Sequence, residues 1–107
     1  MKPQRQITAA DVARAIVMAC RAMDEDPEAV VSDPTLMSRG RRVAYDALRS
    51  AFPDEPRTAL ARYLGFPEAY NVSSGVNMAR RSSWWPELLV DEIVGCLVAG
   101  EYGDRAA

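Results

Sequence analysis

The sequence predicts an all-α protein, a compact domain of five to six helices that spans residues 1–107. Two observations predict this class. Apolar residues recur at helical spacing along the chain, and no segment shows the polar–apolar alternation of a half-buried strand. The length of 107 residues suffices for one hydrophobic core but not for two. We therefore expect a single domain.

The first third of the chain predicts one helix followed by short connecting elements. Thr8–Asp11 form a variant capping box, and the apolar stripe that follows predicts a helix over residues 9–23. A proline at the start of residues 27–31 favours a short helical element, and residues 33–37 form a further turn. The residues expected to face the core are Val12, Ile16, Cys20, Met23, Leu36 and Met37.

A second long helix is predicted from Ser38, its N-cap, to about Phe52. Its apolar residues form a continuous inward stripe, whereas its charged residues share the outer face. The inward stripe consists of Val43, Ala44, Ala47, Leu48, Ala51 and Phe52, and the outer face of Arg39, Arg42, Asp46 and Arg49.

Two short helices follow with the spacing of a helix-turn-helix. After the loop of residues 53–56, residues 57–64 are predicted to be helical, and Gly65 ends this helix with a positive φ. Residues 67–71 form the turn, and the next helix continues through Arg81. Its cap is Asn71 or Ser73, and its inward residues are Val72, Val76 and Ala79.

The last predicted helix, residues 86–101 before Gly103, is unusually apolar. Its apolar residues cover more of the circumference than one core stripe requires, so it either completes the core, which we favour, or docks on a partner. For Trp84 and Trp85, which precede it, packing is favoured over base stacking. The apolar residues of this helix are Leu88, Leu89, Val90, Ile93, Val94, Leu97 and Val98.

The residue inventory argues against an enzyme. The chain contains no histidine, the commonest general base near neutral pH and the commonest zinc ligand. It has no phosphate-binding glycine motif, and Cys20 and Cys96 lie far apart, as expected for two buried thiols. Asp91 and Glu92 are adjacent and diverge around a helix, so they form no acid–base pair. We expect no catalytic residue, no cofactor and no metal.

The first residues of the chain predict no secretion. Its start, Met-Lys-Pro-Gln-Arg, enters no apolar signal core, and no apolar run reaches the length of a membrane span. We expect a cytoplasmic, nucleoid-associated protein without membrane contact.

Positive charge is concentrated in the middle of the chain. The net charge is −2, but residues 39–81 contain eight basic and four acidic residues and carry +4, whereas residues 1–38 carry −2 and residues 82–107 carry −4. All eight basic residues of the middle segment are arginine, whose planar guanidinium suits phosphate oxygens and guanine edges. A genome whose codon usage favours arginine explains the excess of arginine over the whole chain as well as DNA binding does. It does not explain why the positive charge is concentrated in the middle of the chain.

The helix that ends near Arg81 displays the hydroxyl, amide and guanidinium groups that bind base edges. We expect it to enter a major groove, with Arg57 and Thr58 on flanking phosphates and Arg39 and Arg41 on the backbone or an adjacent minor groove. The alternative is a solvated helix face with a serine cap. The expected DNA-binding residues are Arg39, Arg41, Arg42, Arg57, Thr58, Asn71, Ser73, Ser74, Asn77, Arg80 and Arg81.

Three segments carry a family resemblance. Arg39-Gly40-Arg41-Arg42-Val43-Ala44 is similar to a basic loop followed by an Arg-x-x-Ala run, and residues 60–66 to an Ile-Gly-x-x-Phe-Gly segment. Residues 72–76 with Ala79 are similar to an Asp-His-Thr-Thr-Val signature with a later alanine, although Val-Ser replaces Asp-His and glycine replaces the second threonine. In this order the segments resemble the C-terminal DNA-binding domain of the bacterial replication initiator DnaA, a six-helix domain with a helix-turn-helix of the Trp-repressor type.

The resemblance implies sequence-specific binding of double-stranded DNA. Because the ATPase module of the initiator is missing and the signature differs, we do not expect replication initiation at the initiator's own DNA box. The chain is also similar to the DNA-binding part of the gene transfer agent activators of alphaproteobacteria, which implies a transcriptional activator of a prophage-like cluster. RNA polymerase or integration host factor are then the implied co-partners.

The rival hypothesis is a protein interaction module that docks through the apolar last helix. The acidic ends of the chain suit this hypothesis. The same helix is the expected dimer contact if the protein binds DNA as a homodimer.

Overall fold

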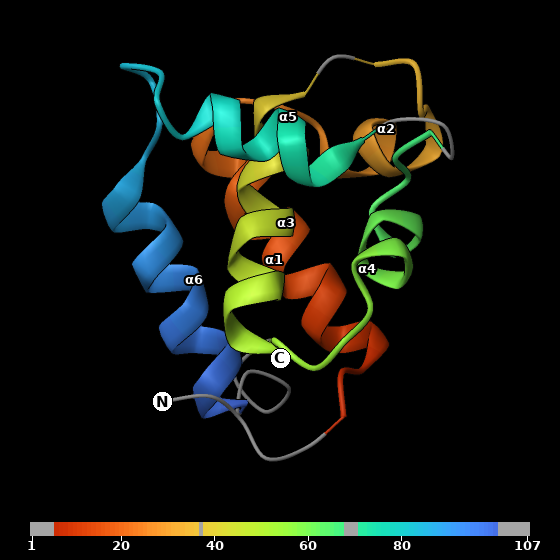
Figure 1. Cartoon of the computed structure of the whole chain (residues 1–107), viewed down its shortest axis with the longest axis vertical. Coiled ribbons are helices and arrows are strands. Elements are labelled where there is room, and N and C mark those ends of the chain that lie inside the picture. Colours follow the sequence, from red (N-terminus) through yellow and green to blue (C-terminus); the bar gives the residue numbers. More distant parts are fainter. Residues whose placement is uncertain (1–5, 37, 68–70, 101–107) are drawn as a thin grey trace.

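The structure, a computed structural model, describes residues 6–36, 38–67 and 71–100 (Figure 1). Within these ranges it contains six helices and no strand, so the all-α prediction is confirmed. Each helix lies within two residues of its predicted bounds. The helices are α1 (Ala9–Ala22), α2 (Pro27–Ser32), α3 (Arg39–Ala51), α4 (Arg57–Tyr63), α5 (Val72–Ala79) and α6 (Glu87–Ala99).

Helix α3 is the centre of the domain. It contacts α1, α4, α5 and α6, and Figure 1 shows α4 and α6 on its two sides with α5 crossing one end. Nine of its thirteen residues are buried, including the whole predicted inward stripe within the helix. The prediction that Asp46 lies on an outer face is wrong, because helices surround α3 and leave Asp46 only 5% exposed.

Helices α1 and α3 approach closely because small residues meet where they cross. A Cβ atom on Gly40 would stand 2.8 Å from Cys20 Sγ and 2.9 Å from Cys20 Cα. On α1, Ala15 and Ala19 are fully buried. The Cys20 thiol is buried as predicted, whereas Cys96 is only half-buried.

Glu25 caps α3 from the turn that follows α1. Its carboxylate accepts hydrogen bonds from Ser38 Oγ at 2.6 Å and from the backbone N–H groups of Arg39 and Gly40, both at 3.1 Å. The predicted N-cap is also present, since Ser38 Oγ accepts from the Arg41 N–H at 2.9 Å. A carboxylate at this position satisfies N–H groups that lack intrahelical partners and opposes the positive end of the helix dipole. The N-terminus of α3 therefore already holds an anionic group of the chain itself.

Local signals set the other helix ends. The Thr8–Asp11 capping box is present in both directions, at 2.8 Å and 3.3 Å. Gly65 follows α4 with a φ of +79°, as predicted. Helix α6 ends at Ala99 and is capped by Gly100, with a φ of +67°, whereas residue 101, the predicted end, lies outside the described residues. Gly103, which was expected to follow the helix, lies outside the described residues.

The core contains most of the residues that the sequence assigned to it. Ile16 and Cys20 are buried, and Val12 and Met23 are half-buried. Leu36 is an exception, since its residue is 39% exposed. It lies in the turn after α2, and it meets the rest of the protein through its backbone carbonyl, which accepts a hydrogen bond from Arg41. Met37 lies outside the described residues.

Helix α6 and the tryptophans before it complete the core. Val90, Ile93 and Leu97 are buried, so the favoured prediction for this helix is confirmed for its inner face. Trp85 is buried and Trp84 packs against the core, with ring centroids 5.5 Å apart, which confirms that the two rings pack. No described helix combines the length and apolar character needed to cross a membrane.

Candidate nucleic-acid interface

The candidate interface is formed by α4 and α5, which are joined by the eight residues 64–71. This connection is longer than the turn of about three to four residues in a typical helix-turn-helix. Its start is fixed by Phe66, whose ring makes an edge contact with Tyr45 at 5.9 Å and lies 5.5 Å from the Arg41 guanidinium carbon. These contacts hold the start of the connection, at Phe66, against α3.

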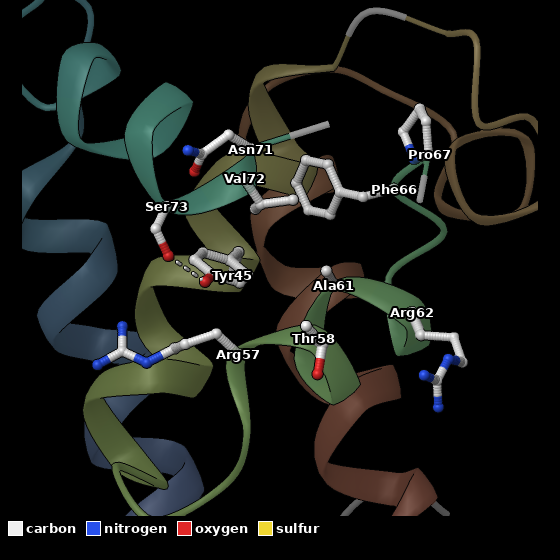
Figure 2. A pocket seen from close by; sticks show the side chains of 10 residues that line it. All are labelled: Tyr45, Arg57, Thr58, Ala61, Arg62, Phe66, Pro67, Asn71, Val72 and Ser73. Carbon is white, nitrogen blue, oxygen red and sulfur yellow. Dashed lines mark hydrogen bonds between the residues drawn. The ribbon is translucent and has the colours of Figure 1, made fainter. Parts of the chain in front are cut away.

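A groove of about 470 Å³ lies between α4 and α5 (Figure 2). Ala61, Phe66 and Val72 give it an apolar lining. Figure 2 shows Arg57 and Arg62 extending from the two ends of α4 in different directions. The other residues with polar groups that line the groove are Tyr45, Thr58, Asn71 and Ser73.

The outward face of α5 and the turn after it form one exposed stripe. Ser74, Asn77, Met78 and Arg81 are all exposed, and their spacing of three, four and seven residues places them along one side of a helix. On the opposite side Val72, Val76 and Ala79 are buried, as predicted. Met78 is 69% exposed and was missed by the sequence analysis, although its position four residues after Ser74 signals it.

Five arginines of the basic middle segment are exposed. They are Arg39, Arg57, Arg62, Arg80 and Arg81, and none pairs with a carboxylate of the described residues. Four of them lie on α4 or at the end of α5. The Arg39 guanidinium carbon lies 4.7 Å from the centroid of the Trp84 ring, a cation–π contact at the start of α3.

Arg41 does not belong to this surface. It is 3% exposed, and its guanidinium donates hydrogen bonds to the carbonyl oxygens of Val30, Asp33 (2.8 Å) and Leu36 (3.1 Å). Burial lowers the pKa of this guanidinium from its ordinary value. The expectation that Arg41 contacts DNA is therefore wrong, because its side chain holds the end of α2 and the following turn against α3.

Arg42 is half-buried beside this cluster. It lines a separate cavity with Phe66 and Pro67 rather than the groove between α4 and α5.

Two of the polar residues expected at DNA make contacts inside the protein. Asn71 Oδ1 accepts from the Ser74 N–H at 3.1 Å and caps α5, as one of the two predicted caps. Ser73 is half-buried with its hydroxyl 2.7 Å from the Tyr45 hydroxyl (Figure 2). Ser73 therefore joins α5 to α3 rather than facing outward, which corrects the prediction for this residue.

Asn77 remains exposed, but one side of its amide is engaged. Its Oδ1 accepts a hydrogen bond from Arg49 Nη2 at 2.8 Å. Of the residues expected at DNA, Arg57, Thr58, Ser74, Arg80 and Arg81 are exposed, and their side chains make no hydrogen bond to another described residue.

The fold and the surface together define a small all-α protein with an exposed, arginine-rich face over α4 and α5. Among the residues that the structure describes, no three His, Cys, Asp or Glu side chains come together to hold a metal ion. No protein-family model, curated protein or solved structure matches the chain.

Proposed function

We propose that the protein binds double-stranded DNA through α4 and α5 and acts as a transcriptional regulator. One observation carries this proposal: hydroxyl, amide, thioether and guanidinium groups form an outward stripe along α5 and the turn after it, and the N-terminal end of α5 shares a groove with the exposed Arg57 and Arg62 of α4. Base edges in a major groove are bound by these kinds of group, and phosphates by guanidinium groups and hydroxyls.

The dimensions and chemistry of α5 suit a major groove. An α-helix with its side chains is about 10–12 Å across, comparable to the major-groove width of about 12 Å. In the proposed complex Arg81 would make a bidentate contact with guanine, Ser74 a single hydrogen bond, and Met78 an apolar contact with a thymine methyl group.

Helix α4 supplies the phosphate contacts in this arrangement. Arg57 and Thr58 lie at its N-terminus and Arg62 near its C-terminus, and all three are exposed at the groove. Contacts of this kind fix the register and orientation of the protein on the duplex. Arg80 and Arg39 add positive charge at the end of α5 and the start of α3.

The biological target follows from the resemblance rather than from geometry. We propose promoters of a gene transfer agent or prophage-like cluster as the sites, with RNA polymerase or integration host factor as partners on the same DNA. Selection of bound fragments from genomic DNA tests this part of the proposal.

Salt dependence tests DNA binding itself. Each phosphate contact contributes about −0.9 to the slope of log affinity against log salt concentration. We expect a steep slope for the wild type, and a slope less steep by about 0.9 for Arg57→Ala. Arg21→Ala removes an exposed arginine of α1 and should leave the slope unchanged. A folded wild type that binds no duplex, or a slope insensitive to Arg57, contradicts the proposal.

One observation favours a second function, docking of a protein partner on α6. Leu88 is 84% exposed, beside the exposed carboxylates of Glu87, Asp91 and Glu92. A partner held by this face, including a second copy of the chain, is expected to bind through Leu88. Leu88→Ala should then weaken association with that partner. DNA binding should stay unchanged where the partner is a different protein and weaken where it is a second copy of the chain.

A further inference from the structure

Two hydrogen bonds join α3 to α5, one helical turn apart on each helix. The Tyr45 and Ser73 hydroxyls lie 2.7 Å apart, and Arg49 Nη2 donates to Asn77 Oδ1 at 2.8 Å. The second bond connects the centre of the domain to a residue of the exposed stripe on α5.

The Arg49 guanidinium is itself held in place. Its Nε donates to Asp46 Oδ1 at 2.9 Å, and Asp46 is buried within α3. Its guanidinium carbon lies 5.5 Å from the centroid of the Tyr45 ring. The charged pair, the ring and the bond to Asn77 therefore restrain the same planar group from three directions.

This arrangement determines the orientation of the Asn77 amide. A guanidinium carries only hydrogen-bond donors, so the amide atom that faces Arg49 has to be the oxygen. The amide nitrogen of Asn77 then points away from Arg49, on a side chain that is exposed on the candidate DNA-binding face. An asparagine without such a neighbour presents its oxygen and its nitrogen equally well.

We propose that Arg49 is a positioning residue that makes Asn77 a hydrogen-bond donor toward DNA, and that the base opposite Asn77 is selected for its acceptors. Guanine presents only acceptors, N7 and O6, in the major groove, whereas cytosine presents a donor. The protein should therefore prefer guanine, and disfavour cytosine, at the position that Asn77 contacts. This inference rests on the proposed function.

Selection from a random duplex library tests the inference. The wild type should prefer guanine over cytosine at one position by about tenfold, and Asn77→Ala should lose that preference. Arg49→Gln should lose it at the same position, because glutamine offers both a donor and an acceptor and frees the amide to rotate. The double variant should lose no more than either single variant.

Two controls separate positioning from loss of charge or of folding. Arg49→Lys keeps a group with donors only and should retain most of the guanine preference. Arg62→Gln makes the same change on α4 and should weaken binding to all sequences alike. If Arg49→Gln is less stable than the wild type, two other results decide the question: the guanine preference of Arg49→Lys, and the NMR signals of the Asn77 side-chain amide. These signals are assigned by their loss in Asn77→Ala.

The outcomes distinguish this inference from the proposed function. A wild type that binds duplex DNA, with a guanine preference that Arg49→Gln leaves unchanged, overturns the positioning role alone. Asn77 amide signals that Arg49→Gln does not shift have the same meaning. A folded wild type that binds no duplex overturns both. Loss of preference in Asn77→Ala and Arg49→Gln at one shared position, with retention in Arg49→Lys, supports the inference.

Discussion

Gly65 lies directly against the backbone of Val31. A Cβ atom on Gly65 would stand 2.6 Å from the Val31 carbonyl oxygen, and the φ of Gly65 is +79°. We expect Gly65→Ala to lower the free energy of unfolding by about 2 kcal/mol or more, because the left-handed conformation costs a side-chain-bearing residue about 1–2 kcal/mol and the carbonyl has to move as well. Urea unfolding measures the change.

Gly95 provides the matched control. It lies inside α6, and a Cβ atom on it would meet nothing within 4 Å. Gly95→Ala should therefore raise the free energy of unfolding by about 0.5–1 kcal/mol, since alanine is the better helix former. Equal effects of the two substitutions would contradict this account of Gly65.

The Glu25 carboxylate should contribute strongly to stability. Glu25→Ala removes the acceptor for Ser38 Oγ and for the backbone N–H groups of Arg39 and Gly40. Unsatisfied donors in this half-buried position should lower the free energy of unfolding by about 1–3 kcal/mol, as measured in urea. Glu28→Ala, an exposed glutamate on α2, should change it by less than about 0.5 kcal/mol. A similar small effect for both variants would argue against the cap.

Stability should fall at high pH because of Cys20. Burial, with a further contribution from the Glu25 carboxylate, raises the pKa of the thiol from 9.0 to about 12. Between these values the folded protein keeps the proton while the unfolded chain loses it. The contribution of the protonated Cys20 thiol to the free energy of unfolding is therefore complete below about pH 9. Above this pH it declines by up to about 1.4 kcal/mol per pH unit.

Cys20→Ala isolates this contribution. Urea unfolding at pH 8, 9 and 10 should show a decline for the wild type that is smaller in the variant. The variant starts from a lower stability at pH 8, so the comparison concerns the slope with pH and not the value at one pH. Parallel curves for the two proteins would exclude the thiol as the cause.

The helices could be predicted because their signals are local. The Thr8–Asp11 capping box, the Asn71 cap and the terminating Gly65 each act over four residues or fewer. The inward stripe of α3 follows from its periodicity in the same way. These features depend on neighbours along the chain, so the sequence alone reveals them.

The fate of individual charged residues could not be predicted in this way. Arg41 and Arg42 are adjacent arginines, yet Arg41 is buried and donates hydrogen bonds to three backbone carbonyls, whereas Arg42 is half-buried and donates to none of these three. Arg41 does lie three residues before Ala44 and seven before Leu48, on the inward side of α3, but its carbonyl partners come from α2 and the following turn, and only the packing brings them to it. The Glu25 cap on Ser38 joins residues thirteen apart, and only the packing of α1 against α3 brings them together.

Arg41 and Arg57 should respond to truncation in opposite ways. Arg41→Ala leaves the carbonyl oxygens that it binds without this partner, so we expect the free energy of unfolding to fall by about 3 kcal/mol or more. Arg57→Ala, on an exposed side chain, should change stability by less than about 0.5 kcal/mol and weaken DNA binding. Thermal and urea unfolding, beside duplex titrations, compare the two. A stable Arg41→Ala variant with weakened DNA binding would restore Arg41 to the interface.

Met78 should make the protein sensitive to a thymine methyl group. Its side chain is 69% exposed on the outward stripe of α5, where an apolar group can contact that methyl. Burial of one methyl contributes about 0.8 kcal/mol, so replacing the contacted thymine by deoxyuridine should weaken wild-type binding about fourfold. Met78→Ala should show almost no difference between the two duplexes, whereas Leu88→Ala, an exposed leucine on α6, should keep the full difference. A fourfold preference that survives Met78→Ala would assign the methyl contact to another residue.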